Sequence, residues 1–165
     1  MHQVDAAVEE ALRVNQGDIL NYLTRRLTNV EDAADLFGDT YATAWRRRKS
    51  MPGDSEGARK WLFVVARNTL LNHRRSSRRS SALSDSLRSE LQRVAVVVEA
   101  HDDRLAVQEA IASLDPQQAE LVRLVHWDRM TLADAADVIG IPASTARSRY
   151  AIARARLAEL LALVP

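Results

Sequence analysis

The chain has 165 residues, of which 47% are hydrophobic and 27% charged, and its formal net charge is +1. The absence of cysteine excludes disulfides and thiolate metal sites. No apolar run approaches the roughly 20 residues of a membrane-spanning helix, and the N-terminus lacks the basic-then-apolar pattern of a signal peptide. With only five Gly and four Pro, this composition predicts an all-α protein of the cytoplasm without membrane insertion.

The near-zero net charge conceals four blocks of alternating sign. Residues 1–40 carry eight acidic and three basic side chains, whereas residues 41–80 carry two acidic and eleven basic ones. Residues 81–140 carry eleven acidic and five basic side chains, and residues 141–165 carry one acidic and four basic ones. Segregated positive charge suits a polyanion, and segregated negative charge suits a basic partner. The basic residues are mostly Arg, whose guanidinium fits phosphate and base edges.

Two helices are predicted in the first 46 residues. Apolar residues recur at helical spacing over residues 5–27, with Gly17 as a point of interruption. Thr28 or Asn29 then offers an N-cap for a second helix. In that helix an apolar stripe at spacings of four, three and one residues is expected to face the core. Its members are Phe37, Tyr41, Ala44 and Trp45.

A loop and a third helix complete the N-terminal part. The stretch "RRRKSMPGDSEG", residues 46–57, has the Pro, Gly and Asp content of a loop. A helix follows from about Ala58 and runs into the basic sequence "NHRRSSRRSS". Large aromatic side chains are most often buried, so we expect Phe37, Trp45 and Trp61 to be core residues.

Helical periodicity weakens between Ser80 and Asp102. This stretch begins with a Ser-rich run and, near its end, contains the apolar run "VAVVV". The sequence does not show which of the two neighbouring domains this run packs against. We interpret residues 80–102 as a flexible linker between two small helical domains, residues 1–79 and 103–165.

The C-terminal part carries a helix-turn-helix pattern. Asp115 and Pro116 provide a cap and a first-turn proline, and Thr131 begins a further helix that Gly140 ends. Pro142 prevents that helix from continuing, and a last helix begins near Ser144. A helix ended by Gly, a short turn and a second capped helix define the motif.

The last helix is predicted to expose Ser144, Arg147 and Ser148 opposite its buried stripe. Small residues let a helix enter a major groove, where an N-terminal Arg reaches a base edge. Arg149 lies nearer the core, and Arg154 lies further along, where it would meet phosphate. The alternative interpretation is an ordinary helical hairpin whose arginines are solvated.

Two charged stretches in the N-terminal half are further candidates for binding. Asp32, Asp35 and Asp39 fall along one side of the second helix. The four His are scattered in the sequence, so no His is expected to join these aspartates, and a solvated or docking surface is favoured over a metal site. Residues 67–79 contain five Arg, a run suited to phosphate binding or to a solvated tail. The sequence contains no recognisable nucleophile with its base, phosphate-binding glycine loop or set of zinc ligands. We therefore expect that the chain is not an enzyme and that it uses no cofactor or small-molecule substrate.

Three segments, in this order, resemble a bacterial RNA polymerase σ factor of the extracytoplasmic-function group. "EDAADLFGDTYATAWR", residues 31–46, resembles region 2.2. "ARKWLFVVARNTLLNHRR", residues 58–75, resembles regions 2.3 and 2.4. Residues 114–157, from "LDPQQAELVRLVHW" to "ARSRYAIARARL", resemble region 4. The resemblance implies a region 2 bundle and a region 4 helix-turn-helix.

The resemblance also implies partners and contact residues. Core RNA polymerase, promoter DNA and an anti-σ factor are the expected partners. The loop of residues 48–57 and the third helix would hold the −10 element and capture an extruded base. The implied sets are Asp32, Asp35 and Asp39 for polymerase; Arg67, Asn68, Asn72, Arg74, Arg75 and Arg78 for the −10 element; and Ser144, Thr145, Arg147, Ser148, Arg149 and Arg154 for the −35 element.

The chain departs from the family pattern at several positions. Gly38 stands where Gln is common, and Ala151 and Ile152 replace a common His-Arg pair. The same residues leave two rival functions open. One is a free-standing helix-turn-helix regulator that binds duplex DNA without polymerase. The other is a metal-dependent nuclease built on the three aspartates of the second helix.

Overall fold

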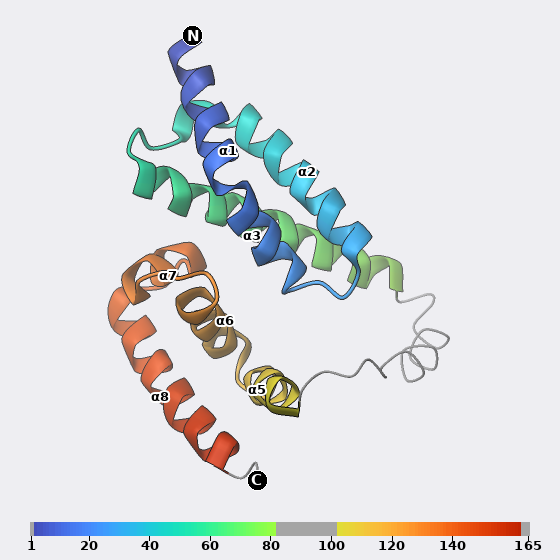
Figure 1. Cartoon of the computed structure of the whole chain (residues 1–165), viewed down its shortest axis with the longest axis vertical. Helices are drawn as coiled ribbons and strands as arrows, with labels where there is room; N and C mark the ends of the chain where they lie inside the picture. The colour runs from blue at the N-terminus through green and yellow to red at the C-terminus, as the bar shows by residue number, and fades with distance from the viewer. Residues whose placement is uncertain (1, 82–101, 163–165) are drawn as a thin grey trace. The chain divides into compact units, whose positions relative to one another are not determined.

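The computed structural model describes residues 2–81 and 102–162, and it divides into two compact units, residues 1–85 and 86–165. Every regular element in the described ranges is a helix, which confirms the all-α prediction (Figure 1). The linker predicted for residues 80–102 lies, apart from its ends, outside the described residues.

The N-terminal unit is a bundle of three long helices and one short one. Helix α1 spans His2–Thr24, α2 Val30–Arg46, the 3-10 helix η1 Arg48–Ser50 and α3 Ser55–Ser81. Helix α1 continues through Gly17 without interruption. The three long helices all pack against one another (Figure 1). Their largest fully buried side chains include Val8, Ile19, Tyr22, Leu23, Leu62, Phe63 and Leu70.

The start of α2 settles which of two predicted caps is used. Asn29 has extended backbone geometry, and its Oδ1 accepts a hydrogen bond from the backbone N of Glu31 at 2.8 Å. This bond satisfies one of the free donors of the first turn. The cap is therefore Asn29 rather than Thr28.

The prediction that Phe37, Trp45 and Trp61 are core residues is wrong. Trp45 is 38% exposed, and Phe37 and Trp61 are only half-buried. The aromatic positions in the core belong to Tyr22 and Phe63, whose rings meet edge to face at 5.4 Å. Helix α2 is therefore rotated from the predicted stripe, of which only Ala44 is buried. The buried residues of α2 are Ala33, Leu36, Thr40 and Ala44.

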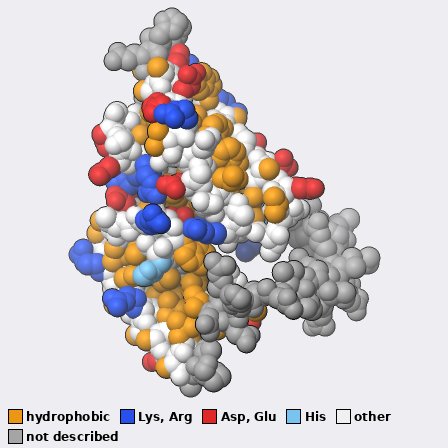
Figure 2. Space-filling model, in the orientation of Figure 1, with side chains coloured by type: hydrophobic (Ala, Val, Ile, Leu, Met, Phe, Trp, Pro, Cys, Tyr) orange, Lys and Arg blue, Asp and Glu red, His pale blue; other side chains and the backbone are white. Residues whose placement is uncertain are grey.

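The acidic and basic sequence blocks of the N-terminal unit partly neutralise each other. Figure 2 shows acidic and basic side chains interspersed over the visible face of this unit. Such partly exposed pairs each contribute at most about 1 kcal/mol to the stability of the fold. An Arg side chain that is paired in this way is less available to bind a ligand. The pairs are Arg48–Asp5 at 2.5 Å and Arg59–Asp18 at 3.0 Å. His73 Nε2 also lies 3.9 Å from Asp32 Oδ2.

The C-terminal unit contains four helices. Helix α5 spans Asp102–Ala112, α6 Pro116–His126, α7 Leu132–Ile139 and α8 Ala143–Ala162. Helix α8 packs against the other three. One core cluster of the unit consists of Ile111, Leu114, Ala119, Val122 and Ala153, against which Trp127, Tyr150 and Leu157 pack.

The helix boundaries of this unit follow the predicted capping residues. The Asp115 side chain accepts a hydrogen bond from the Gln117 backbone N at 3.0 Å. Thr131 Oγ1 accepts from the Asp134 backbone N at 3.1 Å and donates to the Asp134 carboxylate at 2.7 Å. Gly140 ends α7 in the left-handed region, with φ 82° and ψ 38°. These local signals confirm the predicted helix-turn-helix.

Two glycines of the N-terminal unit should respond oppositely to replacement by alanine. A Cβ at Gly57 would lie 2.8 Å from Pro52 Cβ and 2.6 Å from Asp54 Oδ2, part of the carboxylate that accepts the Gly57 backbone N–H at 2.7 Å. We expect Gly57→Ala to cost about 1 kcal/mol through loss of this cap. A Cβ at Gly38 meets nothing within 4 Å, so Gly38→Ala should stabilise by about 1 kcal/mol through helix propensity. Urea unfolding of both variants measures the change in the free energy of unfolding. An unchanged midpoint for Gly57→Ala would show that the loop around Pro52 and Asp54 moves aside without loss of stability.

Candidate nucleic-acid and protein interfaces

Helix α8 presents a polar face to solvent and packs against the rest of its unit through small buried residues. Ala146 and Ala153 are fully buried, so the backbone of α8 lies close to the helices beneath it. Ser144, Arg147 and Ser148 are exposed on the opposite side. The outward orientation predicted for these three residues is therefore confirmed. Of the remaining predicted −35 residues, Thr145 and Arg149 are half-buried and Arg154 is exposed.

A hydrogen bond that the sequence analysis missed joins α8 to the end of α6. Tyr150 Oη lies 2.8 Å from His126 Nε2, and the two rings stack with centroids 6.2 Å apart. Tyr150 also packs against the core cluster and stands between the two buried alanines. Because alanines alone offer little resistance to rotation, this contact helps to fix the direction in which the exposed face of α8 points.

The Tyr150 hydroxyl can be tested by a change that preserves its ring. We expect Tyr150→Phe to lower the free energy of unfolding by about 1 kcal/mol, because the bond to His126 is lost while the apolar packing remains. Thermal unfolding of the full chain measures the effect. In a double-mutant cycle with His126→Ala, the second substitution should add little to the first. Fully additive losses would mean that the two side chains do not interact in solution.

The residues predicted for the −10 element lie on the C-terminal half of α3 but do not share one role. Asn68, Asn72 and Arg75 are exposed and fall on one side of the helix. The Arg74 guanidinium instead donates to the Arg26 backbone carbonyl at 3.2 Å, which ties α3 to the segment after α1. By exposure, the predicted set divides into half-buried Arg67 and exposed Asn68, Asn72, Arg74, Arg75 and Arg78.

The acidic side of α2 adjoins this basic helix. Asp35 and Asp39 are exposed, whereas Asp32 is half-buried and lies 3.9 Å from His73 of α3. The expectation that no His joins the aspartates is therefore wrong, because the fold brings together residues 41 positions apart. A polar groove between α2 and α3 is lined by Asp39, Asn72 and His73, among others. Among the described residues, no group of three or more His, Cys, Asp or Glu could hold a metal ion.

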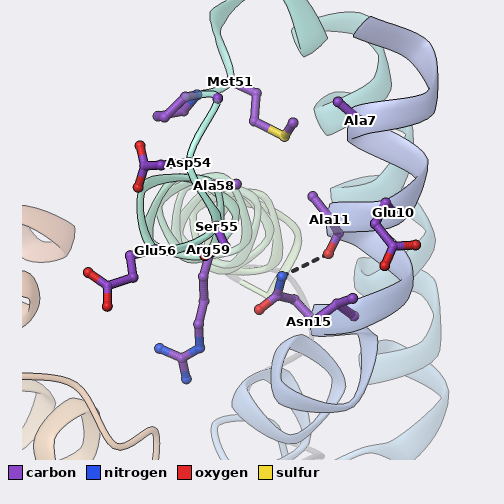
Figure 3. A pocket seen from close by; sticks show the side chains of 13 residues that line it. Ala7, Glu10, Ala11, Asn15, Met51, Asp54, Ser55, Glu56, Ala58 and Arg59 are labelled. Carbon is purple, nitrogen blue, oxygen red and sulfur yellow. Dashed lines mark hydrogen bonds between the residues drawn. The ribbon is translucent and has the colours of Figure 1, made fainter. Parts of the chain in front are cut away.

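A second hollow, of about 470 Å³, lies between α1, the loop after η1 and the start of α3 (Figure 3). Its lining is largely apolar, although Glu10, Asp54, Glu56 and Arg59 border it. The Asn15 side chain, which also lines it, donates to the Ala11 backbone carbonyl at 2.8 Å. The sequence analysis missed this hollow, although α1 carries a second apolar stripe that could have indicated it. That stripe consists of Val4, Ala7, Ala11 and Val14.

One unit has adjoining acidic and basic helices and the other has an exposed helix-turn-helix, an arrangement typical of DNA-binding proteins. Comparison with known families agrees. Residues 12–80 match the family model described as Sigma-70 region 2, and residues 104–157 match the model described as Sigma-70, region 4. None of the described helices is long and apolar enough to span a membrane.

Individual relatives narrow the assignment. The chain is 30% identical to ECF RNA polymerase sigma factor SigL of Mycobacterium tuberculosis, over 93% of this chain and 89% of SigL. It is 29% identical to RNA polymerase sigma-E factor of Streptomyces coelicolor, over 93% of this chain and 85% of that protein. The sigma factor RpoE of Bartonella quintana, solved with the anti-sigma factor NepR, matches with a TM-score of 0.72 and 25% identity over 95% of this chain and 98% of that one. The chain belongs to the sigma-70 family, as an RNA polymerase sigma factor of the extracytoplasmic-function group.

Proposed function

We propose that this sigma factor binds core RNA polymerase in the cytoplasm and directs it to promoters by contacting a −10 and a −35 element. The polymerase supplies the chemistry, and this chain performs no reaction of its own. The observation that carries the proposal is the exposed Ser144–Arg147–Ser148 face of α8 in the same chain as the adjoining acidic and basic helices α2 and α3.

The acidic side of α2 is the proposed docking surface for polymerase. Asp35 and Asp39 project into solvent, and Asp32 stands at the border with α3. A row of carboxylates attracts a basic partner and sets its register. Because Asp39 also lines the groove beside Asn72, polymerase bound at α2 would lie directly next to DNA bound at α3.

The −10 element is proposed to follow the exposed side of α3. Arg75 and Arg78 would contact phosphates, and Asn68 and Asn72 would contact bases. Arg67 and Arg74 would contribute from the edge of this surface, since one is half-buried and the other is bonded to Arg26. The hollow beside Met51 and Pro52 is roomy enough for an extruded base, whose apolar faces match its lining (Figure 3).

The −35 element is proposed to receive α8 in its major groove. Arg147 and Ser148 would contact base edges, with Ser144 and Thr145 at the helix entrance. Arg149, which is half-buried, and Arg154, which is exposed, would contact phosphates on the two sides of the groove.

An anti-sigma factor is proposed as a further partner. Bartonella quintana RpoE was solved in complex with the anti-sigma factor NepR, and this chain matches that sigma factor over nearly its whole length. An inhibitor of this kind would act by covering the polymerase-binding or DNA-binding surfaces.

Transcript mapping tests the proposed function. The chain is mixed with sigma-free core polymerase and a promoter library, and the transcripts are sequenced, with core polymerase alone as control. We expect defined start sites that share two upstream motifs. Tight binding to duplex DNA combined with no effect on core polymerase would instead favour a free-standing regulator. Absence of both activities would overturn the proposal altogether.

A further inference from the structure

One large apolar side chain of the helix-turn-helix points into solvent. Ile152 is 56% exposed, and it is the only large hydrophobic residue of the described helices α6, α7 and α8 that is exposed. Singly exposed apolar residues are common on protein surfaces, so exposure alone indicates no function. The position of Ile152 on α8 is what distinguishes it.

Ile152 borders the middle of the outward face of α8. At about 100° per residue, Ser144, Ser148, Ala151 and Ala155 form the strip opposite the buried Ala146 and Ala153, and all four are exposed. Ile152 flanks this strip on one side, and Arg147 and Arg154 flank it on the other. Its side chains are small enough for α8 to approach the floor of a groove closely, which would bring Ile152 and Arg147 within reach of base edges.

The charge of the helix indicates a polyanion as the occupant of this face. The four basic residues of α8 are all Arg, and Glu159, its only acidic residue, pairs with Arg156 at 3.0 Å. Arg147 and Arg154 form no ion pair within the described part of the chain. A purely apolar partner would leave these charges unmatched, whereas DNA matches them and still offers one apolar group in its major groove.

That apolar group is the C5 methyl of thymine, the only methyl that an unmodified base pair displays in the major groove. We propose that Ile152 is a specificity-determining residue that recognises a thymine of the −35 element through this methyl. The inference rests on the proposed function, because it requires α8 to lie in the groove. Ile152 is five residues beyond Arg147, about 7.5 Å along the helix axis. Because the two side chains also lie on opposite flanks of the strip, the thymine is a different base from the one that Arg147 contacts.

Replacing thymine by deoxyuridine removes only the methyl group and therefore tests the contact directly. The −35 element found by transcript mapping is synthesised with each thymine of either strand replaced in turn, and competitive binding to the holoenzyme is measured. With the unmodified chain we expect one position to lose about threefold to fivefold in affinity, the amount expected for one buried methyl. With Ile152→Ala the same replacement should have no effect, while every other position should behave as before.

Two further variants keep the result interpretable. Leu20→Ala removes a similarly exposed apolar side chain from α1, 41% exposed, and should leave the deoxyuridine profile unchanged. Ile152→Val retains a branched apolar tip and should restore most of the methyl sensitivity. Because Ile152 is exposed, its variants should unfold at the same temperature as the parent chain.

The outcomes separate the inference from the function on which it rests. If the unmodified holoenzyme selects a −35 element but no thymine replacement weakens binding, Ile152 does not recognise a methyl. Equal losses in the parent chain and in Ile152→Ala overturn the inference in the same way, as does a −35 element without thymine. Failure of the holoenzyme to select any −35 element would instead contradict the proposed function.

Discussion

Reversing one charge with Asp35→Lys should weaken binding to core RNA polymerase by at least a hundredfold. Asp35 is the most informative of the three acidic positions because it is exposed and forms no ion pair among the described residues. Asp32 faces His73, and Asp39 lines the groove shared with α3, so changing either would also disturb the unit itself. Bringing like charges together across an interface costs several kcal/mol, whereas Lys is a better helix former than Asp.

The matched control for this variant is Glu9→Lys, which changes the charge of the same unit equally at an exposed position of α1. Fluorescence anisotropy of labelled chain titrated with core polymerase measures both affinities at two salt concentrations. We expect Glu9→Lys to bind nearly as tightly as the parent chain. Equal weakening by both variants would indicate a general effect of net charge and would remove α2 as the docking surface.

The parts of the fold that the sequence predicted well depend on local interactions. Thr131 and Asp134 cap α7 within one turn, and Gly140 ends it through its own backbone freedom. The outward face of α8 follows from helical periodicity alone. Such signals involve residues at most four positions apart, so they can be recognised without knowledge of the tertiary structure.

The errors concern contacts between helices. His73 lies beside Asp32, and His126 bonds to Tyr150, although the members of these pairs are 41 and 24 positions apart in the sequence. Trp45 was expected in the core because it is large and apolar, yet the residues of α2 that pack inward are Ala33, Leu36, Thr40 and Ala44. Periodicity defines an apolar stripe only to within about one residue, so the rotation of α2 was decided by packing.

The same distinction applies to the candidate sites. The residues assigned to polymerase and to the −10 element form two separate runs in the sequence, so the sequence does not show which of their side chains meet. In the structure the two sets share a groove, where Asp39 and Asn72 both line the wall. A ligand bound on one helix therefore changes the electrostatic field at the other over a distance shorter than the Debye length of physiological salt.

Arg147→Ala should reduce discrimination between the preferred −35 element and single-base variants by about 1–3 kcal/mol, which is the value of one bidentate base contact. Arg147 is exposed on the face opposite Ala146 and Ala153, so its removal should not affect folding. Holoenzyme binding to a panel of −35 variants measures the effect. Arg154→Ala is the matched control, because a phosphate contact should weaken binding to all sequences alike and reduce its salt dependence. A uniform loss for Arg147→Ala as well would assign Arg147 to the phosphate backbone.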